Sequence, residues 1–177
     1  MYQAMKARYI TYPALFASLT AIGAQISIPV GEVPLTFQVL FVLLSGFILG
    51  ARMGFLSQVV YLLMGAIGLP VFAGFKGGLV HLYGPTGGYL LAFPLAAFLA
   101  GLITRRGNFV NYLIASLVGI STIYFLGWIR LGLLMRDFEK AFELGVAPFV
   151  TFDLIKTGIA ITVIERLKKI RTKIGSL

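Results

Sequence analysis

Among the residues of this sequence that could do chemistry, an acid and a base come first. Asp153 and Lys156 interrupt the last long apolar segment, "APFVTFDLIKTGIAI". On a helix, residues three apart project from one face and can pair. A charge at the centre of a bilayer costs about 3 kcal/mol or more, so such residues usually face a bundle interior or a water-filled cavity. The pair is therefore either a salt bridge that joins helices or a ligand site with one acceptor and one donor.

A glycine-rich segment is the second candidate. Residues 73–88 contain six glycines: Gly74, Gly77, Gly78, Gly84, Gly87 and Gly88. Glycine permits positive φ and a close approach of the backbone to a small molecule. In "GPTGGY", Pro85 suits the first turn of a helix, whose free N–H groups could meet an acceptor. The segment is either a mobile connector or a gate over a site. The motif GxxxxGK[ST] is absent from the sequence, so no phosphate-binding loop is expected.

Five other side chains stand out from the apolar background. Gln38 and Gln58 lie inside apolar blocks and need partners, either other helices or a ligand. His81 is the one histidine, so we interpret it as a loop residue and expect no metal site. Tyr124 and Trp128 are typical of an aromatic belt at a membrane interface, which we favour over a stacking platform.

The composition sets the environment in which these residues act. Of the 177 residues, 59% are hydrophobic and 12% are charged, and the mean hydropathy is +0.95. A soluble domain carries about 25% charged residues. The apolar residues come in blocks that approach the roughly 20 residues of a bilayer-spanning helix. The sequence predicts a membrane protein with several spans.

We predict an all-α bundle of six transmembrane helices that forms one membrane-embedded domain, residues 1–177. The connection between the third and fourth spans is the glycine-rich segment, on the outer side. The stretch 135–145 alternates charged and apolar residues and predicts a short interfacial helix. The spans are expected at 9–28, 36–50, 54–72, 86–103, 109–135 and 146–165.

The distribution of cations orients the bundle. The net charge is +9, and ten of the 15 cations fall on the side that holds both termini. Because cytoplasmic loops carry an excess of Lys and Arg, both termini are expected in the cytoplasm. The first half of the last span, with Asp153 and Lys156, then lies toward the outside. No basic stripe with interleaved aromatics is present, so nucleic acid is not an expected partner.

Small residues suggest close helix contacts. The stripe of Ala92, Ala96 and Ala100 favours internal packing, whereas Ala17 and Ala21 on the first helix could offer a face to another protein.

With these residues in view, the chain closely resembles the BioY family, the biotin-specific substrate-binding (S) components of energy-coupling factor (ECF) transporters. The resemblance covers about residues 10–165. It is carried by "ISIPVGEVPLTFQVLFVLLSGFILGARMG", "LLMGAIGLPVFAGFKGGL", "LYGPTGGYLLAFPLA" and "DLIKTG". The element "GLPVFAG…GPTGGY" is the most specific of these.

The resemblance implies a six-helix S component in the cell membrane that captures biotin from outside. It implies partners: a transmembrane coupling subunit, docked through small residues such as Ala17 and Ala21, and two ATP-hydrolysing subunits. ATP would be used by those subunits only, and this chain would need no cofactor. Its substrate contacts are then expected at the helical pair and the loop that closes over the vitamin: Asp153, Lys156, Gln38, Lys76, Gly77, Thr86, Gly87, Gly88 and Tyr89.

The chemistry of biotin fits that expectation. Its ureido ring has two N–H donors and one polar carbonyl, all of which a dry pocket must satisfy. Asp153 would accept from an N–H, and Lys156 would donate to the carbonyl or to the carboxylate. Catalysis is not expected, because GxSxG is absent and the one histidine lies in a loop. The alternatives are an S component for another vitamin and a stand-alone secondary transporter.

Overall fold

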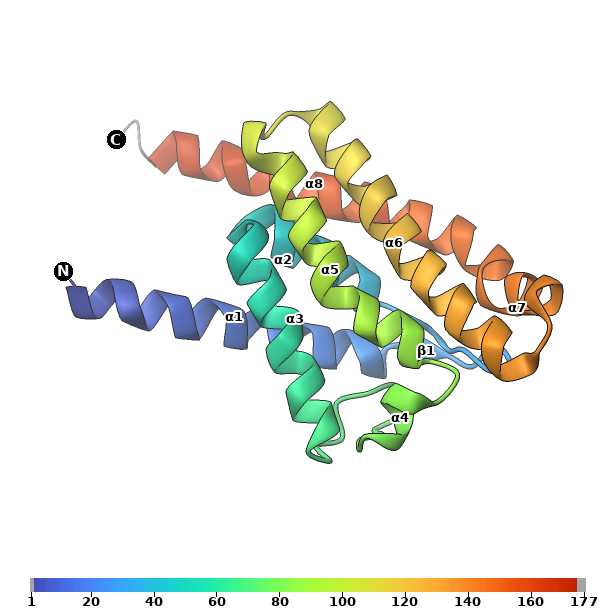
Figure 1. Cartoon of the computed structure of the whole chain (residues 1–177). Helices are drawn as coiled ribbons and strands as arrows, with labels where there is room; N and C mark the ends of the chain where they lie inside the picture. The colour runs from blue at the N-terminus through green and yellow to red at the C-terminus, as the bar shows by residue number, and fades with distance from the viewer. Residues whose placement is uncertain (1, 175–177) are drawn as a thin grey trace.

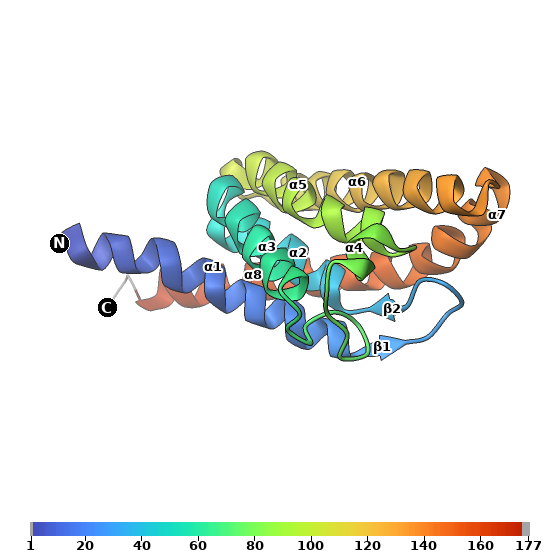
Figure 2. The same ribbon diagram turned by 60° about the horizontal axis from the view of Figure 1, so that its bottom comes forward.

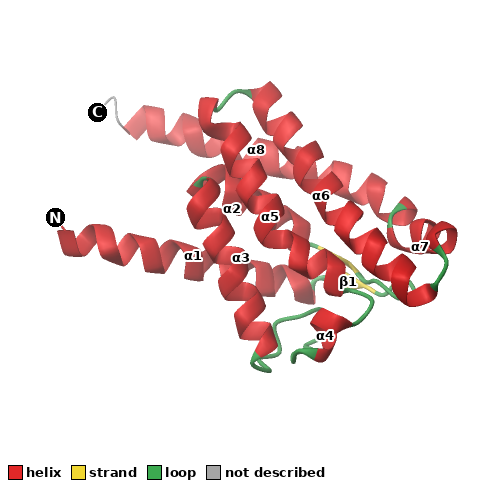
Figure 3. Ribbon diagram, viewed as in Figure 1, coloured by secondary structure: helices red, strands yellow, loops and turns green. Residues whose placement is uncertain are grey.

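The computed structural model of the chain describes residues 2–174, and these are almost wholly helical (Figure 3). The side chains of residues 2–8, 106 and 171–174 lie outside that description. The six predicted spans correspond to six helices of 12 to 27 residues: α1 (Tyr2–Gln25), α2 (Gln38–Leu49), α3 (Ala51–Ala66), α5 (Gly87–Ile103), α6 (Phe109–Met135) and α8 (Val150–Ile174). The short elements are β1 (Ser27–Ile28), β2 (Leu35–Thr36), α4 (Val80–Tyr83), α7 (Phe138–Gly145) and the 3₁₀ turns Thr104–Arg106 and Ala147–Phe149.

Within residues 2–174, two helical stretches are long and apolar enough to cross a membrane on their own. They are Phe109–Met135, with a mean hydropathy of 1.8, and Phe138–Ile170, with 1.5. The helices Gln38–Leu49 and Gly87–Ile103 are apolar but shorter. Many large apolar side chains on the outward faces of the bundle are exposed. This surface suits a protein surrounded by lipid.

The two ends of the bundle differ. Both chain termini lie at one end, whereas α7 and the β1–β2 hairpin lie at the other (Figure 1). The turned view shows the hairpin alongside the start of α8 and near the connection that carries α4 (Figure 2). In the hairpin, Ser27 pairs with Thr36 and Ile28 with Leu35. The connections of the far end therefore gather around one region.

The centre of the bundle is built from α2 and α5, which most of the other helices contact. Small residues let the backbones approach: a Cβ on Gly46 of α2 would meet the Ala97 carbonyl of α5. A Cβ on Gly101 of α5 would likewise meet the backbone of Ala51. Around these contacts, side chains such as Leu43 are fully buried. The helices are fixed by close packing, as in other small-residue interfaces within membranes.

The two stripes of small residues have different surroundings. Ala92, Ala96 and Ala100 are fully buried, which confirms their role in packing. Ala17 is also fully buried within this chain, so its side chain is not open to a partner, contrary to the prediction. Ala21 is partly exposed. Docking through α1 stays a prediction that involves the exposed side of this helix.

Gln58 belongs to a buried polar cluster between α1, α2 and α3. Its Nε2 atom lies 3.2 Å from the hydroxyls of Thr20 and Ser57 and 3.3 Å from that of Ser45. Of the two roles open from the sequence, the structure gives Gln58 the role of joining helices.

Several helix ends differ from the prediction: α1 covers 2–25 instead of 9–28, and α8 covers 150–174 instead of 146–165. At two other boundaries the difference has a local reason. The third helix ends at Ala66 and not at residue 72, because Gly68 has a φ of +100° and Pro70 follows. The interfacial helix expected at 135–145 is α7, which begins after Asp137; the Asp137 side chain caps it by accepting from the Lys140 N–H at 2.9 Å.

Candidate functional site

The first turns of α8 carry the acid and base predicted from the sequence. A 3₁₀ turn that contains Pro148 leads into this helix, so Asp153 falls in its first turn and Lys156 one turn later. The Lys156 Nζ atom lies 2.6 Å from Asp153 Oδ1. The two residues are only 4% and 2% exposed. They form a buried ion pair, the arrangement expected for charges three residues apart.

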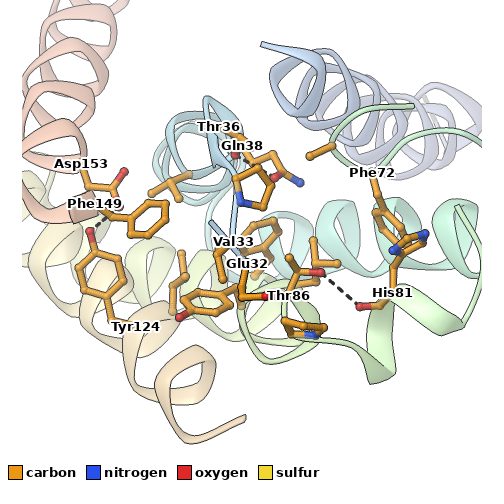
Figure 4. A pocket seen from close by; sticks show the side chains of 18 of the residues that line it. Glu32, Val33, Thr36, Gln38, Phe72, His81, Thr86, Tyr124, Phe149 and Asp153 are labelled. Atoms are coloured by element: carbon orange, nitrogen blue, oxygen red, sulfur yellow. Dashed lines mark hydrogen bonds between the residues drawn. The ribbon is translucent and has the colours of Figure 1, made fainter. Parts of the chain in front are cut away.

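A tyrosine from α6 completes this cluster. The Tyr124 hydroxyl donates to Asp153 Oδ2 at 2.6 Å, so both carboxylate oxygens have a protein donor (Figure 4). Charge-assisted bonds of this kind are short and strong. Each carboxylate oxygen has a further acceptor site. The cluster can therefore bind a neutral N–H group without first losing its own bonds.

The opposite wall comes from the start of α2 and the hairpin before it. The Thr36 hydroxyl donates to Gln38 Oε1 at 2.8 Å, and Gln38 Nε2 donates to the Tyr61 hydroxyl at 2.5 Å. Tyr61 in turn donates to the Val71 carbonyl at 3.1 Å. This chain of bonds fixes the Gln38 amide at the edge of the cavity and ties α2 to the connection after α3.

The third wall is the α3–α5 connection. Phe72 is 3% exposed; its ring packs edge-on to Tyr61 and to His81, at centroid distances of 5.7 and 6.1 Å. The Thr86 hydroxyl donates to the His81 carbonyl at 3.4 Å. Tyr89, in the first turn of α5, bonds through its hydroxyl to the Gly145 carbonyl of α7 at 3.0 Å. The glycine-rich segment is thus folded against the bundle.

These walls enclose a cavity of about 270 Å³ at the end of the bundle away from the termini. Its lining combines an aromatic and aliphatic surface with a few polar groups, as in many sites for small molecules. Figure 4 shows Asp153 and Tyr124 on one side and Thr36 and Gln38 on another. The lining residues are Glu32, Val33, Pro34, Thr36, Gln38, Val39, Phe72, Ala73, Lys76, His81, Pro85, Thr86, Tyr89, Leu90, Phe93, Ile123, Tyr124, Phe149, Asp153 and Lys156.

Six of the nine residues expected to contact a substrate line this cavity: Asp153, Lys156, Gln38, Lys76, Thr86 and Tyr89. Gly77, Gly87 and Gly88 do not line it. A Cβ on Gly77 would meet the carbonyl of Leu69, and one on Gly87 would meet that of Leu82. Gly77 and Gly87 therefore allow a close approach of backbone segments, and their contact with a ligand stays a prediction.

Gly88 packs against α6, where a Cβ would meet the Leu126 carbonyl and the Arg130 side chain. The same arginine reaches back to α4, since its guanidinium donates to the Tyr83 carbonyl. Gly88 therefore permits the close crossing of α5 and α6.

Sequence reasoning missed other lining residues. The assignment of Tyr124 to an interface belt was wrong, because its hydroxyl is bonded to Asp153 inside the bundle. His81 lines the cavity although we interpreted it as a plain loop residue. For Tyr124 the available signal was its polar tip on a face of α6 otherwise lined by small and apolar residues. Phe72 and Phe149 gave no such signal.

No group of three or more potential metal ligands is found among the described residues. The cavity is suited to hydrogen bonding and apolar contact.

Comparisons with known proteins show the family of this chain. A model of the BioY family matches residues 1–173. The chain belongs to the BioY family. Curated BioY relatives include the probable biotin transporter BioY of Pyrococcus horikoshii, which is 52% identical over 93% of this chain and 98% of its own length. The biotin transporter BioY of Thermotoga maritima is 46% identical over 94% of this chain and 99% of its own.

The BioY fold of this chain is also found in a solved structure. The crystal structure of the S component for biotin from an ECF-type ABC transporter superposes with a TM-score of 0.86. The two chains are 28% identical, and the match covers 96% of this chain and 95% of the other. The all-helical membrane fold expected from the sequence is thereby confirmed. These relatives are named as transporters.

Proposed function

We propose that this chain is the biotin-binding S component of an ECF-type importer. It captures biotin on the outer side of the cell membrane and delivers it together with partner subunits. The observation that carries the proposal is the buried cluster of Asp153, Lys156 and Tyr124 in an aromatic cavity of a BioY-family chain.

The chemistry of the cavity supports biotin as the ligand. The Asp153 carboxylate accepts from a ureido N–H, and the Lys156 ammonium donates to the ureido carbonyl or to the carboxylate of the side chain. Gln38 and Thr86, on other walls, supply further polar contacts. Phe72 and other aromatic residues that line the cavity cover the apolar part of the molecule. The cavity thus offers acceptors and donors to the polar groups that biotin would remove from water, as burial requires.

The partners follow from the same proposal. A transmembrane coupling subunit docks on the exposed side of α1, and two ATP-binding-cassette subunits supply the energy, so this chain itself uses neither ATP nor a cofactor. The ten cations on the side of the termini support an orientation with both termini in the cytoplasm. The cavity, at the opposite end of the bundle, then opens toward the outside.

Calorimetric titration of the detergent-purified chain tests the ligand. We expect biotin to bind, and an analogue without the ureido carbonyl to bind weaker by several orders of magnitude, since the site would be left with unpaired buried groups. Tighter binding of another vitamin to monodisperse protein would refute biotin specificity. Uptake of biotin by vesicles that contain this chain alone, without ATP, would favour a secondary transporter instead.

A further inference from the structure

The end of α1 reaches the wall of the cavity through one side chain, Gln25. Its Nε2 atom donates to the Phe72 carbonyl at 3.2 Å. Its Oε1 atom accepts from the Phe75 N–H at 2.9 Å. A single carboxamide thus bonds to both sides of a turn that lies far away in the sequence. Gln25 itself is only partly exposed.

The turn that Gln25 holds is a small closed hairpin of residues 72–76. The Phe72 N–H donates to the Lys76 carbonyl at 2.9 Å, and the Lys76 N–H donates to the Phe72 carbonyl at 3.2 Å. At its tip, Gly74 and Phe75 have φ values of +72° and +56°. A phenylalanine in this left-handed region is strained and persists only where the surroundings hold it. The bond from Gln25 is made to the N–H of that residue.

Few other contacts fix the tip of the hairpin. The Phe75 side chain is 72% exposed, so it does not pack against the bundle. Among the described hydrogen bonds, those from residues 72–76 to other segments of the chain are made by Gln25. Yet Phe72, Ala73 and Lys76 line the cavity. The base of this wall is held by the packing of Phe72 against Tyr61 and His81, whereas its exposed tip is bonded to the rest of the chain by one side chain that does not itself line the cavity.

We infer that Gln25 is a positioning residue that latches the 72–76 hairpin over the cavity and slows the exit of ligand. The inference rests on the proposed function, with biotin as the ligand. Gln25 Nε2 also lies 3.2 Å from the Ala21 carbonyl, so the latch is fixed to α1. A displacement of α1 would be transmitted to the hairpin through the same carboxamide.

Three variants separate the latch from a general effect on stability. Gln25→Leu removes donor and acceptor at similar size. Gln25→Glu keeps an acceptor for the Phe75 N–H but loses the donor to Phe72. Ser18→Ala is the control, because the Ser18 hydroxyl on the same helix bonds only locally, to the Ala14 carbonyl at 3.0 Å.

The main measurement is the rate at which bound labelled biotin exchanges with unlabelled biotin. Gln25→Leu loses both hydrogen bonds to the hairpin, which should raise the dissociation rate by roughly five- to 150-fold. We expect an intermediate rate for Gln25→Glu and the wild-type rate for Ser18→Ala. A wild-type rate in Gln25→Leu would overturn the inference.

Hydrogen exchange of the ligand-free protein gives a second measurement that does not need biotin. Peptides covering residues 72–76 should exchange faster in Gln25→Leu, while those of α8 should not change. If hydrogen exchange becomes faster to the same extent in both regions, Gln25 stabilises the whole fold and the inference that it holds the hairpin is wrong. If the wild-type chain fails to bind biotin, the proposed function falls, and exchange at residues 72–76 still decides whether Gln25 holds the hairpin.

Discussion

Breaking the Asp153–Lys156 pair tests whether it holds a ligand or only the bundle. In the described structure Lys156 Nζ lies 2.6 Å from Asp153 Oδ1, and both residues are buried. Lys156→Met keeps the length of the side chain and leaves the carboxylate with Tyr124 as its remaining donor. Asp153→Asn keeps the shape and leaves a buried ammonium without its counter-charge. Each single change therefore creates an uncompensated group.

A ligand-binding role and a purely structural role of the pair predict different changes in folding stability and in biotin affinity. Removing one partner of a buried pair costs about 3–5 kcal/mol of folding stability. Replacing both by apolar residues, as in Asp153→Leu with Lys156→Met, restores much of that stability, because neither charge remains to be desolvated. Biotin binding should not recover in the double variant. Each ureido group left without a partner costs roughly 1–3 kcal/mol, which is about thirtyfold in affinity at its midpoint.

The assay is calorimetric titration of biotin into the single and double variants, with thermal unfolding measured in parallel. Gel filtration shows which variants remain monodisperse in detergent. Thr162→Val is the matched control on α8, since the exposed Thr162 hydroxyl bonds only to the Gly158 carbonyl of its own helix. Near-wild-type affinity in a well-folded double variant would refute the ligand role and leave the pair as a bridge within the bundle.

Three further predictions concern orientation, helix packing and docking. In intact cells an impermeant maleimide should label Lys140→Cys on α7 and not Arg105→Cys, and the absence of native cysteine keeps the background low; the reverse pattern would contradict the orientation. Gly88→Leu should lower the thermal midpoint, because overpacking against the Leu126 carbonyl costs about 1–3 kcal/mol; an unchanged midpoint would contradict the packing role. Ala21→Trp should prevent co-purification of the coupling subunit while calorimetry still shows biotin binding; loss of binding would assign this residue to internal packing.

The helices could be predicted from the sequence because lipid imposes a simple rule. A span must be a continuous apolar helix, so blocks such as 36–50 and 109–135 are visible without any knowledge of their neighbours. The residues at which the helices end could not be predicted in the same way. Local backbone conformations, such as the positive φ of Gly68 after α3, decide where a helix stops.

Part of the cavity could also be predicted from the sequence. Buried charges are expensive in a membrane, so Asp153 and Lys156 stood out against their apolar segment. Tyr124 did not, because its distance from Asp153 depends on how α6 crosses α8, and tyrosine is common at membrane interfaces. The packing role of the glycines could not be predicted for a related reason. The sequence shows that Gly87 lacks a Cβ but not that the Leu82 carbonyl occupies that space.

The packed centre of the bundle closes the inner side of the cavity, and the end of the bundle away from the termini is called its mouth below. On its inner side, Val42, Leu43 and Tyr61 are fully buried against the neighbouring helices. An interior packed to this density has little room for a molecule of vitamin size to pass. Whatever enters from the mouth must leave by the mouth, unless the helices separate. A bound molecule can then be released on the other side of the membrane only if the opening of the cavity comes to face that side. This requires either a rotation of the whole bundle or a separation of its helices.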